Sequence, residues 1–301
     1  MRDFDWNDVR YFLAVVRART LTLAARRLGT NHTTVARRIA ALEAALNAKL
    51  FDRHVGGYVP TEQGERFLEE AEAMEASAIL ARSRIADSAA TLSGAVRIGA
   101  PDGFGSFFLA PAIGALCDQH PELEVEIVAM PRVFSLSKRE ADIAISLAQP
   151  SQGRLVVRKL TDYQLGLYAA PGYLDRAPPI RGRADLPVHR FIHYIDDLLY
   201  TPQLDYVPQI DKAIRPRLRS ANLVAQMRAA MAGAGICVLP CFMADPEPGL
   251  ARVLAGEVAL TRSFWLAVHA DQRNLARIRT TSQFIVDAVR DARPLFLPAS
   301  A

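Results

Sequence analysis

The polar side chains best suited to chemistry near the start of the chain lie in the run from Thr33 to Arg38, TTVARR. An arginine can donate two hydrogen bonds to the O6/N7 edge of guanine, and a threonine can bond a base or pack its methyl group on thymine. On a helix that turns by about 100° per residue, Thr33 and Arg37 point away from the apolar stripe that contains Val35. We therefore expect Thr33 and Arg37 to read the base edges of DNA.

Other polar side chains around this run suit phosphate contacts, which position a protein on DNA without reading its sequence. They are His32, Thr34, Arg38 and Arg53. His32 has a second interpretation, as a residue of the turn that precedes the helix. An isolated pair of arginines would also suit a solvated helix face, so the interpretation depends on the elements around the run.

Three successive amphipathic segments would position this face, because each carries one apolar stripe at helical spacing. The stripes are Val9, Phe12, Leu13 and Val16, then Leu21, Ala24, Ala25 and Leu28, then Val35, Ile39, Leu42 and Leu46. Thr20 and Asn31 stand where N-caps belong, and Gly29 suits the turn between the last two helices. This pattern predicts a helix-turn-helix and therefore DNA binding.

Charge is distributed unevenly along the chain of 301 residues, whose net charge is +4. Residues 1–60 hold ten Lys/Arg and five Asp/Glu, a net +5, so the other 241 residues carry −1. A basic head on a near-neutral body fits a nucleic-acid module joined to a module with another partner. The N-terminus has acidic residues where a signal peptide needs an apolar core, and we expect no membrane span and a cytoplasmic protein.

Paired glycines, Gly56 and Gly57, follow the third segment and predict a two-stranded wing. Thr61 then caps a long polar helix. Along this helix, small and apolar residues repeat at alternating steps of four and three: Phe67, Ala71, Met74, Ala78, Ala81 and Ile85. That spacing favours a seam for dimerisation, although the helix would alternatively pack on its own protein.

From Gly94 onward the pattern changes to alternating strands and helices, which predicts an α/β body with mostly parallel sheets. We expect strands at residues 96–100, 124–128, 142–146, 155–160, 165–169, 236–239 and 264–269, and helices at residues 105–119, 222–232 and 274–289. No catalytic constellation and no metal-ligand spacing stand out, so we expect no enzyme, no metal and no cofactor. Cys117, Cys237 and Cys241 suit a reducing compartment as ordinary buried residues, with a Cys237–Cys241 redox switch as the alternative.

The chain as a whole resembles the LysR-type transcriptional regulators. The N-terminal motifs that carry the resemblance are Phe12-Leu13-Ala14-Val15, Leu23-Ala24-Ala25-Arg26-Arg27-Leu28-Gly29, Thr34-Val35-Ala36-Arg37-Arg38-Ile39, Leu50-Phe51-Asp52-Arg53 and Thr61-Glu62-x-Gly64-Glu65. In the body they are Gly94-x-Val96-Arg97-Ile98-Gly99, Ala141-Asp142-Ile143-Ala144-Ile145 and Gly233-x-Gly235-Ile236-x-x-Leu239-Pro240. Three positions depart from the common pattern, namely the start of the recognition helix at residues 31–33, Ala36, and the wing at Gly56, and they leave the operator sequence open.

The resemblance implies an α/β chain with a winged helix-turn-helix head at residues 1–60 and a linker and dimerisation helix at residues 61–91. Residues 92–301 would form a periplasmic-binding-protein-like effector domain of two subdomains, residues 92–161 with 268–301, and residues 162–267. The implied partners are double-stranded DNA with a pseudo-palindromic operator, a small-molecule effector, and copies of the chain in a homodimer or homotetramer. RNA polymerase is a further candidate partner.

A ligand site is expected where the segment from Pro101 to Ser106 follows the first strand of the body and opens a helix. Ligands bind at this edge of open α/β sheets, and helix N-termini suit anions. With the cleft that the resemblance places between the subdomains, the candidate effector residues are Pro101, Asp102, Phe104, Ser146, Ile195 and Gly235. Asp102 would act as an N-cap, or it would face the cleft and favour a cationic or hydroxylated ligand over a carboxylate.

The sequence thus predicts a DNA-binding transcriptional regulator controlled by a small molecule. Two other hypotheses stay open: an architectural DNA-binding protein without an effector, and a binding-protein-like enzyme with a vestigial head.

Overall fold

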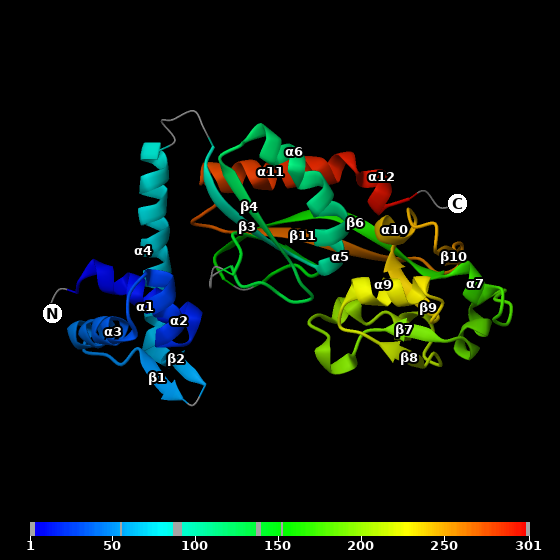
Figure 1. Ribbon diagram of the computed structural model, residues 1–301, viewed down its shortest axis with the longest axis horizontal. Coiled ribbons are helices and arrows are strands. Elements are labelled where there is room, and N and C mark those ends of the chain that lie inside the picture. The colour runs from blue at the N-terminus through cyan, green and yellow to red at the C-terminus, as the bar shows by residue number, and fades with distance from the viewer. Residues whose placement is uncertain (1–3, 55, 87–91, 137–139, 152, 299–301) are drawn as a thin grey trace. The chain divides into compact units, whose positions relative to one another are not determined.

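The computed structural model describes residues 4–54, 56–86, 92–136, 140–151 and 153–298. Among them, the chain forms two compact units, residues 4–86 and residues 92–298 (Figure 1). No helix in these described ranges is long and apolar enough to cross a membrane.

The N-terminal unit is the expected winged helix-turn-helix followed by a long helix. Its elements are α1 (Trp6–Ala18), α2 (Leu21–Leu28), α3 (His32–Leu46), β1 (Phe51–His54), β2 (Gly57–Pro60) and α4 (Glu62–Ala86). The predicted stripes face its core, where Phe12, Val35 and Leu42 are fully buried. The apolar periodicity therefore identified the buried face of each of the three short helices.

Local hydrogen bonds fix the ends of these helices. The Thr20 hydroxyl accepts from the backbone N–H of Leu23 at 3.3 Å, and the Asn31 side chain accepts from that of Thr34 at 2.7 Å. Gly29 ends α2 in the left-handed conformation, with φ of 64°. These contacts confirm the predicted caps and the turn, and they set the angle at which α3 leaves α2.

The wing is an antiparallel pair in which Phe51 lies opposite Pro60. It packs on the end of α1, because the backbone N–H of Tyr58 donates to the carbonyl of Arg19 at 2.7 Å. Gly57, with φ of 119°, makes this approach possible, since a Cβ there would lie 2.3 Å from the same carbonyl oxygen. Gly56 has no such neighbour within 4 Å.

Helix α4 begins after Thr61, whose hydroxyl accepts from the N–H of Gly64 at 3.0 Å, as predicted. The first residues of the predicted seam pack on their own unit: the Phe67 ring lies 5.0 Å from that of Phe12, and Ala71 is fully buried. Further along, Met74 is partly buried, and Ala78 and Ala81 are exposed. The side chain of Ile85 lies outside the described part of the chain.

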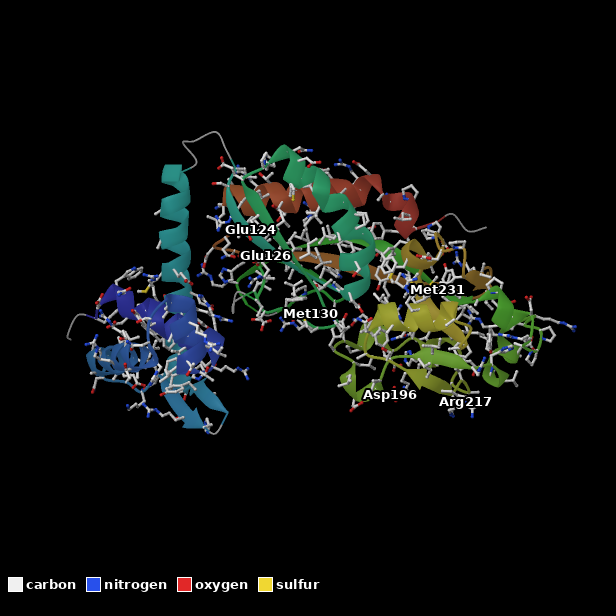
Figure 2. The ribbon with its side chains drawn as sticks, viewed as in Figure 1. Glu124, Glu126, Met130, Asp196, Arg217 and Met231 are labelled. Carbon is white, nitrogen blue, oxygen red and sulfur yellow. The ribbon has the colours of Figure 1, made fainter. Side chains whose placement is uncertain are left out.

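The second unit is built on a nine-stranded sheet with the order β4-β3-β5-β11-β6-β9-β7-β8, with β10 pairing β6. The strands are β3 (Gly94–Ala100), β4 (Leu123–Ala129), β5 (Ile143–Ser146), β6 (Leu155–Ala169), β7 (Phe191–His193), β8 (Pro216–Arg219), β9 (Ile236–Pro240), β10 (Ala251–Val253) and β11 (Leu260–His269). Two charged side chains, Glu124 and Glu126, lie on the edge strand β4 (Figure 2). Charge on an edge strand opposes unwanted strand pairing.

Two expectations for this sheet are wrong. The sheet is mixed, because β6 and β11 run antiparallel through its middle, while parallel pairs lie on either side of them. The strands expected at residues 155–160 and 165–169 are one strand, β6, since the polar stretch between them stays paired with β11. In that stretch Asp162 pairs with Lys159 and accepts a hydrogen bond from the Ser263 hydroxyl, and Tyr163 is buried. The polar residues there suggested a turn, but they belong to the strand.

Helices cover the sheet of the second unit (Figure 1). They are α5 (Asp102–Phe104), a π-helical turn (Gly105–Leu109), α6 (Ala110–Gln119), α7 (Pro171–Leu174), α8 (Val207–Ile210), α9 (Leu223–Met231), α10 (Cys241–Ala244), α11 (Ala276–Asp291) and α12 (Arg293–Phe296). Short 3₁₀ turns lie at Arg183–Val188, Asp196–Leu198 and Pro202–Leu204. Helix α11 packs on α6 and β3, and α9 packs on β7 and β9. This arrangement brings α5 and α9 into contact beside the middle of the sheet.

Gly57→Ala is expected to destabilise the N-terminal unit by about 1–3 kcal/mol, the typical cost of a backbone forced into a sparsely populated region. Gly56→Ala is the matched control, because it adds the same methyl group in open space. Chemical unfolding followed by circular dichroism measures both changes. Equal stability of the two variants would contradict this account of the wing.

Candidate functional site

The face of α3 that the sequence assigns to DNA lies at the surface. His32, Thr33 and Arg37 are exposed, and Thr34 and Arg38 are partly buried. Arg53 is exposed on β1, where its guanidinium lies 5.4 Å from the centre of the Tyr58 ring. The Thr33 hydroxyl donates to the Asn31 side chain at 2.6 Å, so it takes part in the cap of α3. The predicted residues on α3 and Arg53 on β1 thus reach the surface of this unit, and Thr33 and Arg53 already make local contacts.

Arg38 is tied to α1. Its guanidinium pairs with Asp5 at 2.9 Å and with Asp8 at 3.1 Å, and it lies 5.8 Å from the centre of the Tyr11 ring. The Asp8 carboxylate is buried, and burial raises its pKa while the guanidinium of Arg38 opposes that shift. The ion pairs of Arg38 with Asp5 and Asp8 hold α3 against the start of α1.

Arg37, the next residue along α3, makes no hydrogen bond or ion pair within the described part of the chain. Its five N–H donors are therefore available to an external acceptor. A free, exposed arginine near the start of the second helix of a helix-turn-helix suits contact with base edges in the major groove. Of the two predicted base readers, Thr33 bonds Asn31, whereas Arg37 is exposed and makes no hydrogen bond or ion pair within the described ranges.

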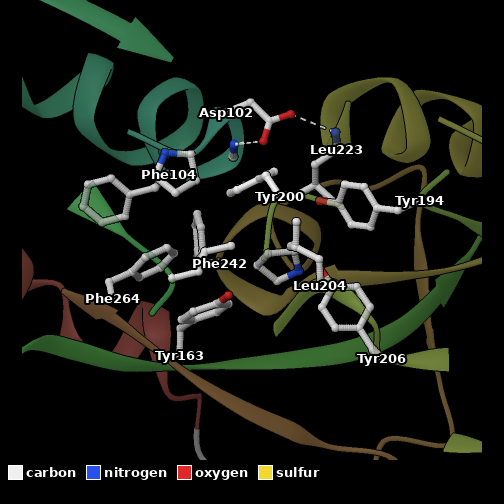
Figure 3. Close-up of a pocket in the computed structure, with 14 residues that line it drawn as sticks. Asp102, Phe104, Tyr163, Tyr194, Tyr200, Leu204, Tyr206, Leu223, Phe242 and Phe264 are labelled. Carbon is white, nitrogen blue, oxygen red and sulfur yellow. Dashed lines mark hydrogen bonds between the residues drawn. The ribbon is translucent and has the colours of Figure 1, made fainter. Parts of the chain in front are cut away.

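The second unit contains a cavity at the contact of α5 and α9, shown in Figure 3. Its lining is mostly aromatic and apolar: Pro101, Asp102, Gly103, Phe104, Leu147, Tyr163, Tyr194, Tyr200, Leu204, Tyr206, Leu223, Pro240, Phe242 and Phe264. The space among these residues measures about 290 Å³, part of it continuous with solvent, and about 20 Å³ accommodates the centre of a water-sized molecule. That room holds one or two water molecules, so the cavity is narrow in this arrangement.

Three of the six predicted effector residues, Pro101, Asp102 and Phe104, line this cavity. Ser146 and Ile195 do not line it, although their neighbours Leu147 and Tyr194 do. The hydroxyl of Ser146 donates instead to the carbonyl of Ala148 at 2.8 Å.

Gly235 also lies outside the lining of the cavity. Its lack of a side chain has a structural reason, because a Cβ there would lie 2.3 Å from the carbonyl oxygen of Arg190. The contributions of Ser146, Ile195 and Gly235 to ligand binding remain predictions.

Asp102 lies between the two helices and is 4% exposed. One carboxylate oxygen accepts from the N–H of Leu223, the first residue of α9, at 2.8 Å, and the other accepts from the N–H of Gly103 at 3.1 Å (Figure 3). Burial raises the pKa of Asp102, and the backbone N–H groups oppose that shift. Asp102 is therefore not the N-cap of its own helix, a position that Pro101 takes, but it bonds the amino end of α9.

Four tyrosines form much of the wall, and sequence reasoning did not select three of them, Tyr163, Tyr200 and Tyr206; the fourth is Tyr194, next to the predicted Ile195. Tyr163 stacks on Phe264 with the ring centres 4.2 Å apart, and burial raises its pKa. Burial raises the pKa values of Tyr194 and Tyr200, and the charge of Asp102 adds to both shifts, so both lie within its electrostatic reach. Tyr194, Tyr200 and Tyr206 lie close together in the sequence, and this clustering was the available signal.

The structure lends less support to a redox switch at the cysteines or to a metal site. Cys237 and Cys241 are buried free thiols, and burial raises the pKa of both, which disfavours the reactive thiolate. Within the described ranges, no group of three or more His, Cys, Asp or Glu side chains could hold a metal ion.

Arg38→Ala is expected to lower the melting temperature, because it leaves the buried Asp8 carboxylate without its cation. Arg37→Ala removes the same side chain from the next position and should leave the melting temperature unchanged, since Arg37 has no partner within the described ranges. Adding Asp8→Asn to Arg38→Ala should restore part of the loss. Thermal unfolding of the three variants tests this. Equal melting temperatures of the two alanine variants would refute the stabilising role of the ion pair between Arg38 and Asp8.

Asp102→Asn is expected to change how stability depends on pH. Because the pKa of Asp102 is raised above its ordinary value of 3.8, the folded state binds its proton more tightly than the unfolded state does. The free energy of unfolding of the wild type, minus that of the variant, should therefore fall as pH rises from about 4 to 7. Urea unfolding at several pH values measures this difference.

Asp185→Asn is the control of opposite sign. Backbone N–H groups of Arg181 and Gly182 lower the pKa of Asp185, so its stabilising contribution is present at neutral pH and is lost in acid. The corresponding difference should rise with pH. If this difference in the free energy of unfolding depended on pH in the same way for both variants, burial would not be what raises the pKa of Asp102.

Comparisons with known proteins agree with both units. Residues 6–65 match the family model for the bacterial regulatory helix-turn-helix protein of the lysR family, and residues 89–290 match that for the LysR substrate binding domain. The chain is 30% identical to the transcriptional regulator PtxR of Pseudomonas aeruginosa over 82% of this chain and 80% of that protein. It is 28% identical to the Mau operon transcriptional activator of Paracoccus denitrificans over 94% of this chain and 96% of that protein.

Solved structures show the same fold along almost the whole chain. CrgA, a LysR-type transcriptional regulator from Neisseria meningitidis, aligns with a TM-score of 0.59 at 20% identity over 95% of this chain and 99% of its own. LysG from Corynebacterium glutamicum, solved with bound effector Arg, aligns with a TM-score of 0.67 at 17% identity over 96% and 99%. The chain belongs to the LysR family of bacterial transcriptional regulators, with an N-terminal helix-turn-helix domain and a C-terminal substrate-binding domain.

Proposed function

We propose that this protein binds operator DNA through α3 and regulates transcription in response to a small molecule bound in the cavity beside Asp102. The observation that carries the DNA part is the exposed Arg37, which is free within the described part of the chain and stands on the second helix of the helix-turn-helix. Thr33 joins it as a base reader, and His32, Thr34 and Arg53 contact phosphates. Arg38 contributes mainly by holding α3 on α1.

Domain boundaries and assembly are part of the same proposal. Residues 1–60 form the DNA-reading domain, residues 61–91 the linker and dimerisation helix, and residues 92–301 the effector domain with the two subdomains that the sequence predicts. The exposed Ala78 and Ala81 on α4 leave a narrow surface that allows close approach of a second helix. A homodimer or homotetramer would then present paired heads to pseudo-symmetric half-sites.

The effector acts by preferring one arrangement of the protein, because a ligand shifts an equilibrium only through its different affinities for the two states. Asp102 is well placed for this, since it joins α5, which follows β3, to α9, which packs on β7 and β9. Chromosomal DNA is the proposed partner, and we therefore assign the protein to the bacterial cytoplasm. Contact with RNA polymerase would complete activation.

Retention of genomic fragments by the purified protein, measured against salt concentration, tests the proposal. Discrete fragments with dyad half-sites and an affinity that falls steeply with salt are expected. Weak and uniform retention of all fragments would refute sequence-specific regulation and favour an architectural role.

Arg37→Ala is expected to weaken binding to a retained fragment by about 1–3 kcal/mol and to relax the preference at one base position. Arg66→Ala on α4, which removes one arginine that pairs with Glu62, is the control of equal charge. Fluorescence anisotropy with single-base variants of the site measures both effects. Unchanged affinity and base preference in Arg37→Ala would remove Arg37 from the interface.

A further inference from the structure

The cavity of the second unit holds a buried negative charge that no cation of the described residues balances. Asp102 is 4% exposed, and its carboxylate takes part in no ion pair within those residues. Buried charges in proteins are normally paired or bound to a metal ion, because desolvation of an isolated charge is costly. The N–H groups of Leu223 and Gly103 donate to this carboxylate at 2.8 and 3.1 Å, and the N–H groups of Asp102 itself and of Val224 act on it as well. All of these donors are uncharged backbone groups.

The amino end of α9 offsets only part of this charge. A helix amino end is equivalent to about half a positive charge, and α9 is capped in addition by Asn222, which accepts from the N–H of Ala225. Arg262 is the cation that acts on Tyr163, but it does not line the cavity. Its guanidinium is bonded to the Gln203 carbonyl and to the Gln209 side chain.

The aromatic side chains that line the cavity can attract an organic cation. Four tyrosine rings and three phenylalanine rings line the cavity, and the face of an aromatic ring attracts a cation through its quadrupole. Tyr163 is nearly fully buried, and its hydroxyl makes no hydrogen bond within the described residues. An occupant with N–H donors could bond this hydroxyl, and a positive charge on it would offset that of Asp102.

Other classes of occupant fit less well. A metal ion would need further carboxylate, histidine or thiolate ligands, and within the described residues no such group surrounds Asp102. A carboxylate ligand would meet the charge of Asp102 and would find the N–H of Leu223 already occupied. The free space of about 20 Å³ suits an occupant of very few non-hydrogen atoms.

We propose that this cavity binds a small alkylammonium ion, with Asp102 as its counter-ion and the tyrosine rings as its cage. The inference rests on the proposed function in one respect, since the same cation is then the effector that controls DNA binding. Asp102, Tyr163 and Tyr200 are the residues that determine specificity for charge and size.

Isothermal titration calorimetry on the full chain tests the site directly, without DNA. The probes are methylammonium, dimethylammonium and tetramethylammonium, with methanol as a small neutral control and acetate as a small anionic control. Methylammonium is expected to bind, and both controls are not. Binding of acetate or methanol as tight as that of methylammonium would overturn the proposal, and so would the absence of heat with every ammonium probe.

Variants then assign the binding to this cavity. Asp102→Asn keeps the shape of the side chain and removes its charge, and it should weaken methylammonium binding at least about tenfold. Asp142→Asn is the matched control, because Asp142 also accepts a backbone N–H, from Arg97 at 2.8 Å, but lies outside the cavity. Equal affinity of these two variants would overturn the assignment.

A second pair of variants, at Tyr200, tests the cavity if Asp102→Asn does not fold. Tyr200 is only partly buried, so substitution there is tolerated better. Tyr200→Phe retains the aromatic face and should bind within a few-fold of the wild type, while Tyr200→Leu should lose about tenfold. Equal binding by both variants would remove the ring from the cage.

Retention of operator DNA with and without methylammonium separates this inference from the proposed function. Specific retention by a protein that binds no ammonium probe leaves the regulator standing and overturns the cation site. Ammonium binding that depends on Asp102 but leaves DNA retention unchanged supports the cation site and overturns its role as effector.

Discussion

The antiparallel pairing of β6 with β11 is the constraint on which the second unit depends. The pairing runs from Leu155 opposite His269 to Leu165 opposite Leu260, so two strands reach from one end of the sheet to the other. The parallel pair β3 and β5 attaches to β11 on one side, and β9 and β7 attach to β6 on the other. Because Tyr163 and Phe264 lie on these two strands, the rings that form one wall of the cavity are fixed by the same pairing.

Two buried carboxylates show how differently one chain can treat a charge. Asp8 in the N-terminal unit faces the guanidinium of Arg38, and this ion pair holds α3 on α1. Asp102 in the second unit is equally buried, but within the described part of the chain its carboxylate accepts only from backbone N–H groups. The first carboxylate has a cation beside it, whereas the second has none among the described residues.

The sequence predicted the N-terminal unit well because its determinants are local. The stripe of Val35, the cap of Asn31 and the left-handed Gly29 each depend on residues within one or two helical turns. The N-terminal part of the predicted seam was ambiguous for the same reason: Phe67 has the spacing of a dimer contact, but it fills a space left by Phe12, which lies far away in the sequence. Periodicity shows that a residue is buried and does not show against what.

The cavity was predicted only in part, because its members meet through tertiary structure. Pro101, Asp102 and Phe104 were accessible to sequence reasoning since they follow a strand and open a helix, a position with a known geometric meaning. Ser146 and Ile195 are each one residue away from a lining side chain, and in extended backbone a step of one residue moves the side chain to the other face. The tyrosines of residues 194–206 lie among short turns without regular periodicity, so no pattern indicated their direction.

If the cavity controls DNA binding as proposed, the contact of Asp102 with Leu223 limits the energy of that coupling. The hydrogen bond is already made in the narrow cavity, so a cation gains nothing from forming it and acts only by favouring the arrangement that contains it. A tenfold preference for that arrangement corresponds to about 1.4 kcal/mol, and a shift from 1:99 to 99:1 needs about 5.5 kcal/mol. A small ammonium ion held by one carboxylate and a few rings would therefore tune the balance of arrangements in one subunit, and repetition of the site in an oligomer would be needed to make the response steep.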